Sequence, residues 1–325
     1  MEGNKGRVCV TGGAGHIASW LIMKLLENGY AVNTTIRSNP VHKEDATFLK
    51  SLLGASQNLE IFDADLNNPE SFNAAIEGCI GVFHVAHPLE FEENESLEIV
   101  TERLVNGTLG ILKACLNSKT VKRVVHTSSI ASVVYNSKDV DVLDENFWTD
   151  IDYVKHNTVV GSYAISKTLT EKAALEFAEQ NGMDVVTILP SFVVGPFICP
   201  KLAGSVRRAL ALIFGDKEEH CSYPLGAVHV DDLARAFIFL LHHSNPKGRY
   251  ICSSEVVTVK MLSEFVSDKY PDLKVPTLDS LQNIKIHKSS VVSSKKLLDA
   301  GFKFNYGFEE MFGGAIQCCK DKGHL

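Results

Sequence analysis

Short runs of apolar, often β-branched residues alternate with longer amphipathic segments over residues 1–190 of the chain. These runs show no regular polar alternation, which is typical of strands that helices cover on both faces. Strict alternation of strands and helices predicts a parallel sheet with right-handed crossovers, the doubly wound α/β (Rossmann) class. The predicted strands are Arg7–Thr11, Ala31–Ile36, Leu59–Asp63, Gly81–Ala86, Val121–Thr127 and Asp184–Leu189, and helices are predicted near 15–28, 42–53, 69–77, 95–118 and 161–181.

The pattern changes after Pro190, where prolines and glycines become frequent and the alternation is lost. We expect a Rossmann domain at 1–190, to which 228–254 returns with a helix and an edge strand, Arg249–Cys252. A smaller, mostly helical substrate-binding lobe is expected from 191–227 and 255–325. Because ligands of doubly wound folds bind beyond the carboxyl ends of the strands, the two parts should share a cleft there. The later helices are predicted near 205–215, 229–241, 258–269 and 307–322.

Composition excludes several classes of function. The 325 residues are 45% hydrophobic and 22% charged, which is an ordinary globular composition. The 32 Lys and Arg against 39 Asp and Glu give a net charge of −7, so the chain has no basic field for nucleic acid. No apolar stretch is long enough for a membrane span, and no apolar signal segment precedes the first strand. The eight cysteines are scattered without a C-x-x-C pair, which predicts no metal site and a cytoplasmic location.

A glycine-rich turn, Gly12-Gly13-Ala14-Gly15-His16-Ile17-Ala18, joins the first predicted strand to the first helix. In this position Gly12 permits a tight turn, and Gly15 lets the backbone approach a pyrophosphate. The small residue Ala18 lets the helix pack closely on the strand. The N-terminus of that helix supplies free N–H groups and a partial positive charge for phosphate. The turn therefore predicts dinucleotide binding.

The end of the second strand indicates which dinucleotide is bound. An NAD site usually has Asp or Glu about 20 residues beyond the glycines, whereas this strand ends in Arg37. A guanidinium suits the dianionic 2′-phosphate of NADP, and Lys43 supplies a second cation. After the third strand, Asp65 is placed either to accept the adenine amino group or to cap the helix that starts near Pro69.

A tyrosine and a lysine, Tyr163 and Lys167, lie four residues apart at the start of a strong helical pattern, hence on one helix face. Carbonyl reduction needs a proton donor, and a neighbouring ammonium is expected to lower the pKa of the Tyr163 phenol toward neutrality. Tyr270 and Lys274 have the same spacing. Their segment contains Pro271 and Pro276, which disfavour a helix, so this second pair is not assigned to the site.

A hydroxyl group that orients a substrate carbonyl is predicted from Thr127-Ser128-Ser129, at the end of the fifth strand. The carboxyl end of this strand lies at the same edge of the sheet as the glycine turn. Ser129 is the preferred residue, and Ser128 and Ser132 are the alternatives. Each of them could instead satisfy backbone groups within the turn.

These motifs together resemble the extended short-chain dehydrogenases/reductases, and more narrowly the plant dihydroflavonol reductase and vestitone reductase relatives. The resemblance also rests on Asp65-Leu66, Val82-Phe83-His84-Val85-Ala86, Pro190-Ser191-Phe192-Val193 and the tail Ala315–Lys320. It covers essentially the whole chain. It implies a catalytic triad of Ser129, Tyr163 and Lys167, NADPH as coenzyme, and reduction of a ketone on a bulky plant specialised metabolite. Residues that it implies at the coenzyme are His16, Ile17, Leu66, Val85, Ala86, His87, Pro190, Val193 and Ser205.

The chain departs from the pattern of these relatives at three positions. His16 replaces a bulky apolar or aromatic residue, and His87 replaces Thr or Ser close to the expected nicotinamide. Val134 stands where dihydroflavonol reductases have an Asn, which argues against a dihydroflavonol substrate. Two alternatives remain to ketone reduction. One is oxidation of an alcohol or hemiacetal of an alkaloid, as in the related noscapine synthase, and the other is a non-catalytic NADP(H) sensor. A small molecule with a bulky aromatic ring system is the expected partner, and the chain is expected to be a monomer or a homodimer.

Overall fold

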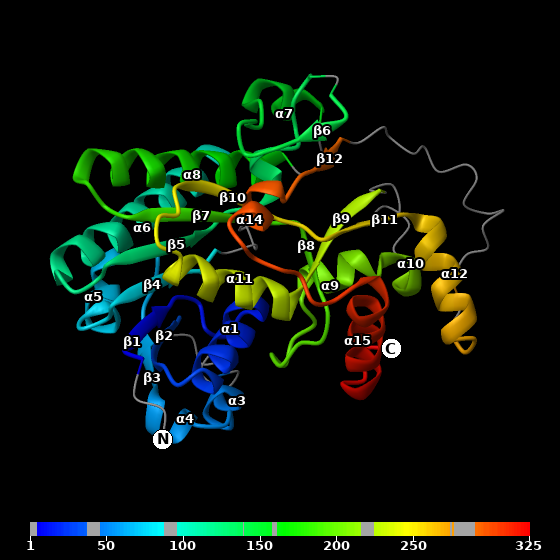
Figure 1. The fold of residues 1–325 in the computed structure, drawn as a ribbon, viewed down its shortest axis with the longest axis horizontal. Helices are drawn as coiled ribbons and strands as arrows, with labels where there is room; N and C mark the ends of the chain where they lie inside the picture. Colours follow the sequence, from blue (N-terminus) through cyan, green and yellow to red (C-terminus); the bar gives the residue numbers. More distant parts are fainter. Residues whose placement is uncertain are drawn as a thin grey trace.

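The computed structural model describes residues 5–37, 46–87, 96–138, 140–157, 161–215, 224–273, 275 and 290–325. Its centre is a seven-stranded sheet in the order β10-β7-β5-β4-β1-β2-β3, in which every neighbouring pair is parallel (Figure 1). This topology confirms the predicted doubly wound class. The strands are β1 (Arg7–Val10), β2 (Ala31–Ile36), β3 (Leu59–Asp63), β4 (Gly81–His84), β5 (Arg123–Thr127), β7 (Val185–Pro190) and β10 (Gly248–Cys252).

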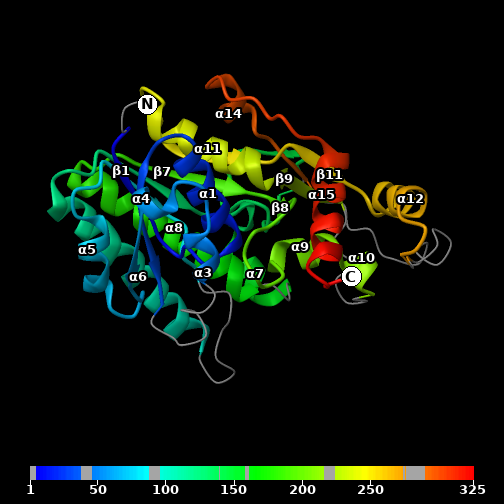
Figure 2. The ribbon, with the colours of Figure 1, turned by 90° about the horizontal axis from the view of Figure 1, so that it is seen from below.

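Helices cover both faces of this sheet (Figures 1 and 2). One face packs against α1 (His16–Glu27) and α11 (Val230–His242), which contact each other, and the other against α5 (Asn73–Ile76), α6 (Leu97–Ser118) and α8 (Gly161–Asn181). The short helix η1 (Pro69–Phe72) precedes α5. Ser96 caps α6 by accepting a hydrogen bond from the Ile99 N–H. Two separate apolar cores result, one on each face of the sheet.

Within the seven-stranded sheet and its helices, the elements agree with the sequence pattern except at the second crossover and at one edge. The helix predicted near 42–53 is represented by α3 (Thr47–Lys50), followed by α4 (Ala55–Asn58), and 42–45 lie outside the described residues. The strand β3 was expected to be covered on both faces, but none of its residues is fully buried. The reason is its place at the edge of the sheet, where a strand neighbours it on one side only.

A smaller unit follows β7 and lies at the right of Figure 1. It holds a three-stranded sheet in the order β11-β9-β8, which the sequence pattern did not reveal because two of its strands have only three residues. Its apolar core is formed largely by residues of these strands and of the helices around them. The elements are β8 (Phe192–Val194), β9 (Leu225–His229), β11 (Glu255–Val257), α9 (Gly204–Ala209), α10 (Ala211–Phe214), α12 (Val259–Lys269) and α15 (Phe308–Asp321).

Four further elements lie outside these two sheets. The segment β6 (Val142–Leu143) pairs with β12 (Val291–Val292), α7 (Ile151–Asn157) packs against α8, and α14 (Lys295–Asp299) packs against β10. The predicted edge strand is present, since β10 pairs in parallel with β7. In the part of the chain that the structure describes, no helix is long and apolar enough to cross a bilayer, and no three His, Cys, Asp or Glu side chains cluster as metal ligands would.

Candidate active site

The turn after β1 is formed by backbone rather than by side chains. Gly12 adopts a φ of +75°, and a Cβ at this position would lie 3.0 Å from the Cα of Ala86. Gly15 is the N-cap residue of α1, and the first turn of α1 contains no acidic residue. The N–H groups at this end of the helix therefore meet no carboxylate that would compete with a phosphate. Three predicted coenzyme residues, Gly12, Gly15 and Ala86, thus meet at the carboxyl edge of the sheet.

Sequence reasoning missed two residues of this turn. A Cβ on Gly13 would overlap Thr34 Oγ1, so only glycine fits between β1 and β2. Thr11 Oγ1 accepts hydrogen bonds from the backbone N–H groups of Val85 and Ala86, both at 3.0 Å. This hydroxyl fixes the segment after β4 beside the glycine turn. The Gly-Gly pair after a strand was an available signal for Gly13, whereas nothing local marks the role of Thr11.

The structure brings His16, Val193 and Ser205 together, although they are far apart in the sequence. Ser205 Oγ donates to the carbonyl oxygen of Val193 at 2.9 Å and lies 3.5 Å from His16 Nδ1. Burial lowers the pKa of His16 to about 4, so the ring is neutral at pH 7. Ile17, next to His16, packs on the core beneath α1. The start of α1 thus contacts α9 of the smaller unit through one imidazole.

Of the two residues predicted to bind the 2′-phosphate, the structure describes only Arg37. Arg37 directly follows β2 and is exposed, and no ion pair within the described residues engages it. Its guanidinium is therefore accessible at the carboxyl end of β2, beside the glycine turn. Lys43 lies outside the described residues, so its placement stays a prediction.

The segment after β3 corrects one of the alternatives for Asp65. Its Oδ1 accepts a hydrogen bond from the Asn67 N–H at 2.8 Å, while the N-cap residue of η1 is Asn68. The capping alternative is therefore wrong, because the Asp65 carboxylate closes a turn before the helix begins. The adenine alternative stays a prediction. Leu66 packs against α6 at Gly107, where a Cβ would lie 3.0 Å from its side chain.

Ser129, Tyr163 and Lys167 gather at the carboxyl end of β5. Tyr163 and Lys167 lie near the start of α8, and Ser129 caps η2 (Ile130–Ser132), with Oγ accepting from the Ala131 N–H at 3.1 Å. The Ser129 side chain also lies close enough to Tyr163 to lower the pKa of its phenol. Lys167 Nζ donates to the carbonyl oxygen of Thr127 at 3.0 Å. All three groups that carbonyl reduction requires therefore lie at the same edge as the glycine turn.

The pKa values of the tyrosine and lysine depart from the expectation. Burial raises the pKa of Tyr163, while the Ser129 hydroxyl and the charge of Arg208 act to lower it. The predicted lowering by Lys167 is wrong, because burial dominates and the lysine ammonium is directed at the Thr127 carbonyl. Burial lowers the pKa of Lys167 to about 7, although the charge of Glu171 opposes this shift. Lys167 thus changes its charge near neutral pH.

Arg208 is a charged residue of the site that the sequence pattern did not reveal. It lies on α9, in the smaller unit, and its charge lowers the pKa of Tyr163. Burial raises the pKa of Tyr135, and Arg208 opposes that shift as well. A cation from the smaller unit therefore approaches two phenols that the larger unit supplies. Only the packing of the two units determines this approach.

His87 lies against the predicted proton donor. The centroids of the His87 and Tyr163 rings are 5.8 Å apart, and the rings meet edge to face at 84°. Burial places the pKa of His87 well below its usual range, and the Lys167 charge acts in the same direction. The imidazole is therefore neutral beside the phenol. Pro190 ends β7 opposite Cys252 of β10.

The residues at this edge fit a bound dinucleotide. Buried polar atoms in proteins normally have a hydrogen-bond partner. Buried atoms without a partner among the described residues include His16 Nε2, His87 Nε2, Thr127 Oγ1 and Ser191 Oγ. They lie at or just after the ends of β1, β4, β5 and β7, four adjacent strands whose carboxyl ends form this edge. A ligand with many polar groups, lying across these ends with its phosphates at the glycine turn, would supply the partners.

Comparison with known proteins agrees with this geometry. Residues 8–252 match the NAD dependent epimerase/dehydratase family. Vestitone reductase of Medicago sativa is 55% identical over 100% of both chains, and its crystal structure matches with a TM-score of 0.90 over 99% of this chain and 100% of that chain. Noscapine synthase SDR1 of Papaver somniferum is 50% identical over 100% of this chain and 95% of its own length. Gre2 of Candida albicans, crystallised with NADPH, is 26% identical, with a TM-score of 0.80 over 97% of this chain and 99% of its own. The chain therefore belongs to the NAD dependent epimerase/dehydratase family, among the short-chain reductases related to plant vestitone and dihydroflavonol reductases.

Proposed function

We propose that the protein is an NADPH-dependent reductase of a ring ketone on a polycyclic, flavonoid-type plant metabolite. The observation that carries this proposal is the gathering of Ser129, Tyr163 and Lys167 beside the glycine turn at the carboxyl edge of the sheet. The 55% identity to vestitone reductase over the whole chain supports both the chemistry and the substrate class. The protein is an oxidoreductase that acts on carbonyl and alcohol groups.

Each of the three side chains has a defined role in this reaction. NADPH, when bound, supplies the hydride. Ser129 donates a hydrogen bond to the substrate oxygen and orients the carbonyl, and Tyr163 gives its proton to that oxygen as general acid. The Lys167 ammonium, one helical turn away, would hold the nicotinamide ribose. The Ser129 hydroxyl and the charge of Arg208, which act to lower the pKa of Tyr163, favour the phenolate that remains after proton transfer. Lys167 is charged below pH 7 and neutral above it, so reduction should slow as the pH rises through about 7.

Binding of the coenzyme is assigned to groups at the ends of β1, β2, β3, β4 and β7, together with one residue each from β8 and α9. The glycine turn and the start of α1 would hold the pyrophosphate, and Arg37 the 2′-phosphate. Asp65 and Leu66 would contact the adenine, while Val85, Ala86, His87, Pro190, Val193 and Ser205 would line the nicotinamide half. Crystals of Gre2 with NADPH, in a chain of the same fold, support this coenzyme.

Oxidation of an alcohol is the second candidate, because noscapine synthase SDR1 is 50% identical to this chain. The same three residues would serve, with Tyr163 as the base that removes the alcohol proton. A panel of ring ketones with NADPH, and of alkaloid alcohols and hemiacetals with NADP⁺, distinguishes the two directions through absorbance of the nicotinamide. We expect turnover of flavonoid-type ketones. Turnover restricted to the alcohol arm would favour the second candidate, and NADPH binding without any turnover would favour a sensor.

Three further properties are proposed with this function. The substrate is expected to lie between the Rossmann domain, 1–190 with 228–254, and a lobe formed by 191–227 and 255–325. The cytoplasm is the proposed location, which the free cysteines among the described residues support. A monomer or a homodimer is the proposed state, and light scattering of the purified protein decides between them.

A further inference from the structure

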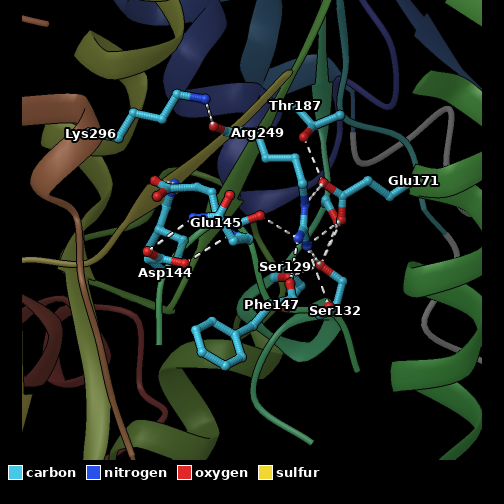
Figure 3. Close-up of polar contacts among 12 residues, drawn as sticks. Ser129, Ser132, Asp144, Glu145, Phe147, Glu171, Thr187, Arg249 and Lys296 are labelled. Atoms are coloured by element: carbon cyan, nitrogen blue, oxygen red, sulfur yellow. Dashed lines mark hydrogen bonds and ion pairs between the residues drawn. The ribbon is translucent and has the colours of Figure 1, made fainter. Parts of the chain in front are cut away.

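A buried carboxylate, Glu171, lies on α8 one turn beyond Lys167 and is 0% exposed. Figure 3 shows its contacts with Thr187, Arg249 and Ser132. Its Oε1 accepts hydrogen bonds from Thr187 Oγ1 at 2.6 Å and from Arg249 Nε at 2.9 Å. Its Oε2 accepts from Ser128 Oγ at 2.7 Å and lies 2.6 Å from Ser132 Oγ. We call these five residues the Glu171 cluster. Because each neighbour offers a donor, the cluster is organised around a negative charge.

The cluster holds the loop that carries Ser129 from both sides. Ser128 and Ser132 flank this residue, and both bond to Glu171. Ser132 Oγ also lies 2.8 Å from the Ser129 carbonyl oxygen and accepts from Arg249 Nη2 at 2.9 Å. One carboxylate therefore connects the Ser129 loop to the helix that carries Tyr163 and Lys167.

Arg249 is itself fixed from the opposite side. Its Nη1 donates to the carbonyl oxygens of Glu145 and Phe147 at 2.9 and 2.5 Å, and its guanidinium carbon lies 3.5 Å from the centroid of the Trp148 ring. The guanidinium thus has little freedom, and its position determines that of the Glu171 carboxylate. A buried ion pair held in this way acts as a rigid support rather than as a surface contact.

The charge of Glu171 also acts on Lys167. Among the described residues, the Lys167 charge also acts on His84 of β4, His126 of β5 and His87 after β4, and it contributes to the lowered pKa of each of these histidines. Burial is the largest cause in all three, so these rings are neutral at pH 7. Among these groups, Glu171 therefore supplies the negative charge that favours the ammonium.

We propose that Glu171 is a positioning residue of the reductase, which fixes Ser129 against Tyr163 through Ser128 and Ser132 and offers Lys167 a negative charge one turn along the helix. The proposal rests on the proposed function for its kinetic consequences. Its electrostatic consequence concerns the protein alone. If the Glu171–Arg249 ion pair were purely structural, its removal would lower the stability of the protein without changing either the pKa of Lys167 or the position of Ser129.

The electrostatic half is tested by NMR on protein labelled with ¹³C at the lysine ε-carbons, with the Lys167 signal assigned from a Lys167→Met variant. In Glu171→Gln the pKa of Lys167 should fall by about one unit or more, because an opposite charge has been removed. In Glu171→Asp, which keeps the charge, the pKa should stay close to that of the wild type. An unchanged Lys167 pKa in Glu171→Gln would overturn this half, whether or not the protein reduces any ketone.

The positioning half is tested by two matched variants, Ser128→Ala and Thr187→Val, each of which removes one hydroxyl bonded to the Glu171 carboxylate. Only Ser128 belongs to the loop that carries Ser129. We expect similar losses in melting temperature, but kcat about tenfold lower in Ser128→Ala and less than about threefold lower in Thr187→Val. Equal effects on kcat would overturn the positioning role.

The charge-preserving variant Glu171→Asp separates the two halves further. It shortens the side chain by one methylene, so Ser129 should shift and kcat should fall by about 10- to 100-fold, with KM nearly constant. The pH at which kcat declines should match that of the wild type, whereas Glu171→Gln should lose activity at lower pH. If Glu171→Gln does not fold, the Ser128 and Thr187 pair still decides the positioning role. A wild-type chain inactive on the ketone panel would refute the proposed function, and the NMR result would still decide the charge effect.

Discussion

The two ends of strands β5 and β7 differ in how completely the polar and charged side chains beside them are hydrogen-bonded. At the amino end, Arg123 donates to Asp184 from Nε at 2.9 Å and from Nη2 at 2.7 Å. Its Nη1 donates to the carbonyl oxygens of Leu240, Leu241 and His243 at 2.9, 2.9 and 2.7 Å. The guanidinium thus caps the C-terminus of α11, where the helix dipole favours a cation.

At the carboxyl end, the cation is Lys167, which is 4% exposed and donates to the Thr127 carbonyl oxygen at 3.0 Å. Burial lowers its pKa to about 7, and it also raises the pKa of Tyr163. Thr127 Oγ1 is buried without a hydrogen-bond partner in the described part of the chain. The same two strands therefore end in satisfied charges at one edge and in perturbed, incompletely paired groups at the other.

This difference indicates which edge of the sheet contributes to stability and which edge is suited to catalysis. A charge with many hydrogen-bond partners contributes to folding, and it gains little from a ligand. A buried group with a shifted pKa costs stability, and it is suited to proton transfer and ligand binding. The carboxyl edge should therefore respond to substitution mainly in activity, and the amino edge mainly in stability.

The largest expected effect tests the carboxyl edge directly. Tyr163→Phe removes the phenolic proton and should lower kcat by about 10²- to 10⁴-fold, as expected for the loss of a general acid. Affinity for NADPH, followed by nicotinamide fluorescence, should stay close to that of the wild type. Unchanged turnover would show that Tyr163 is not the proton donor. The carboxyl edge would then be no more sensitive in activity than the amino edge at this position.

A smaller effect is expected at the end of β2, on the same edge. Arg37→Asp should weaken NADPH binding by about 10- to 100-fold, because charge-assisted hydrogen bonds to the 2′-phosphate are replaced by repulsion. Binding of NADH should change much less, and a titration with both coenzymes provides the control. Equal losses for the two coenzymes would contradict the assignment of Arg37 to the 2′-phosphate.

The smallest effect is expected at the amino edge. Asp184→Asn removes the ion pair of Arg123 but leaves the three carbonyl acceptors, and the Asp184 side chain is 38% exposed. The free energy of unfolding, measured in urea, should fall by about 1 kcal/mol or less. The pH profile of kcat should not move. A displaced profile would show that the amino edge influences the groups at the active site.

Local features of the sequence were sufficient for much of the site. Gly12 and Gly15 follow a strand and precede a helix, and Tyr163 and Lys167 share one turn of α8, so short segments of chain already specify their geometry. The same holds for the central strands, whose apolar runs require two covering layers of helix. Strand β3 was predicted to be covered in the same way but is only partly buried, because it lies at the sheet edge and burial depends on neighbours in space.

Contacts between distant segments decided the rest. The sequence by itself determined the doubly wound class, the glycine turn and the tyrosine–lysine pair, because 3.6-residue and two-residue periodicities and backbone sterics act over a few residues. Only the tertiary structure brought Arg249 to Glu171, Arg208 toward Tyr163 and Thr11 to Val85, and only burial set the direction of each pKa. Electrostatics and desolvation depend on everything within several ångströms, and a linear pattern does not contain those neighbours.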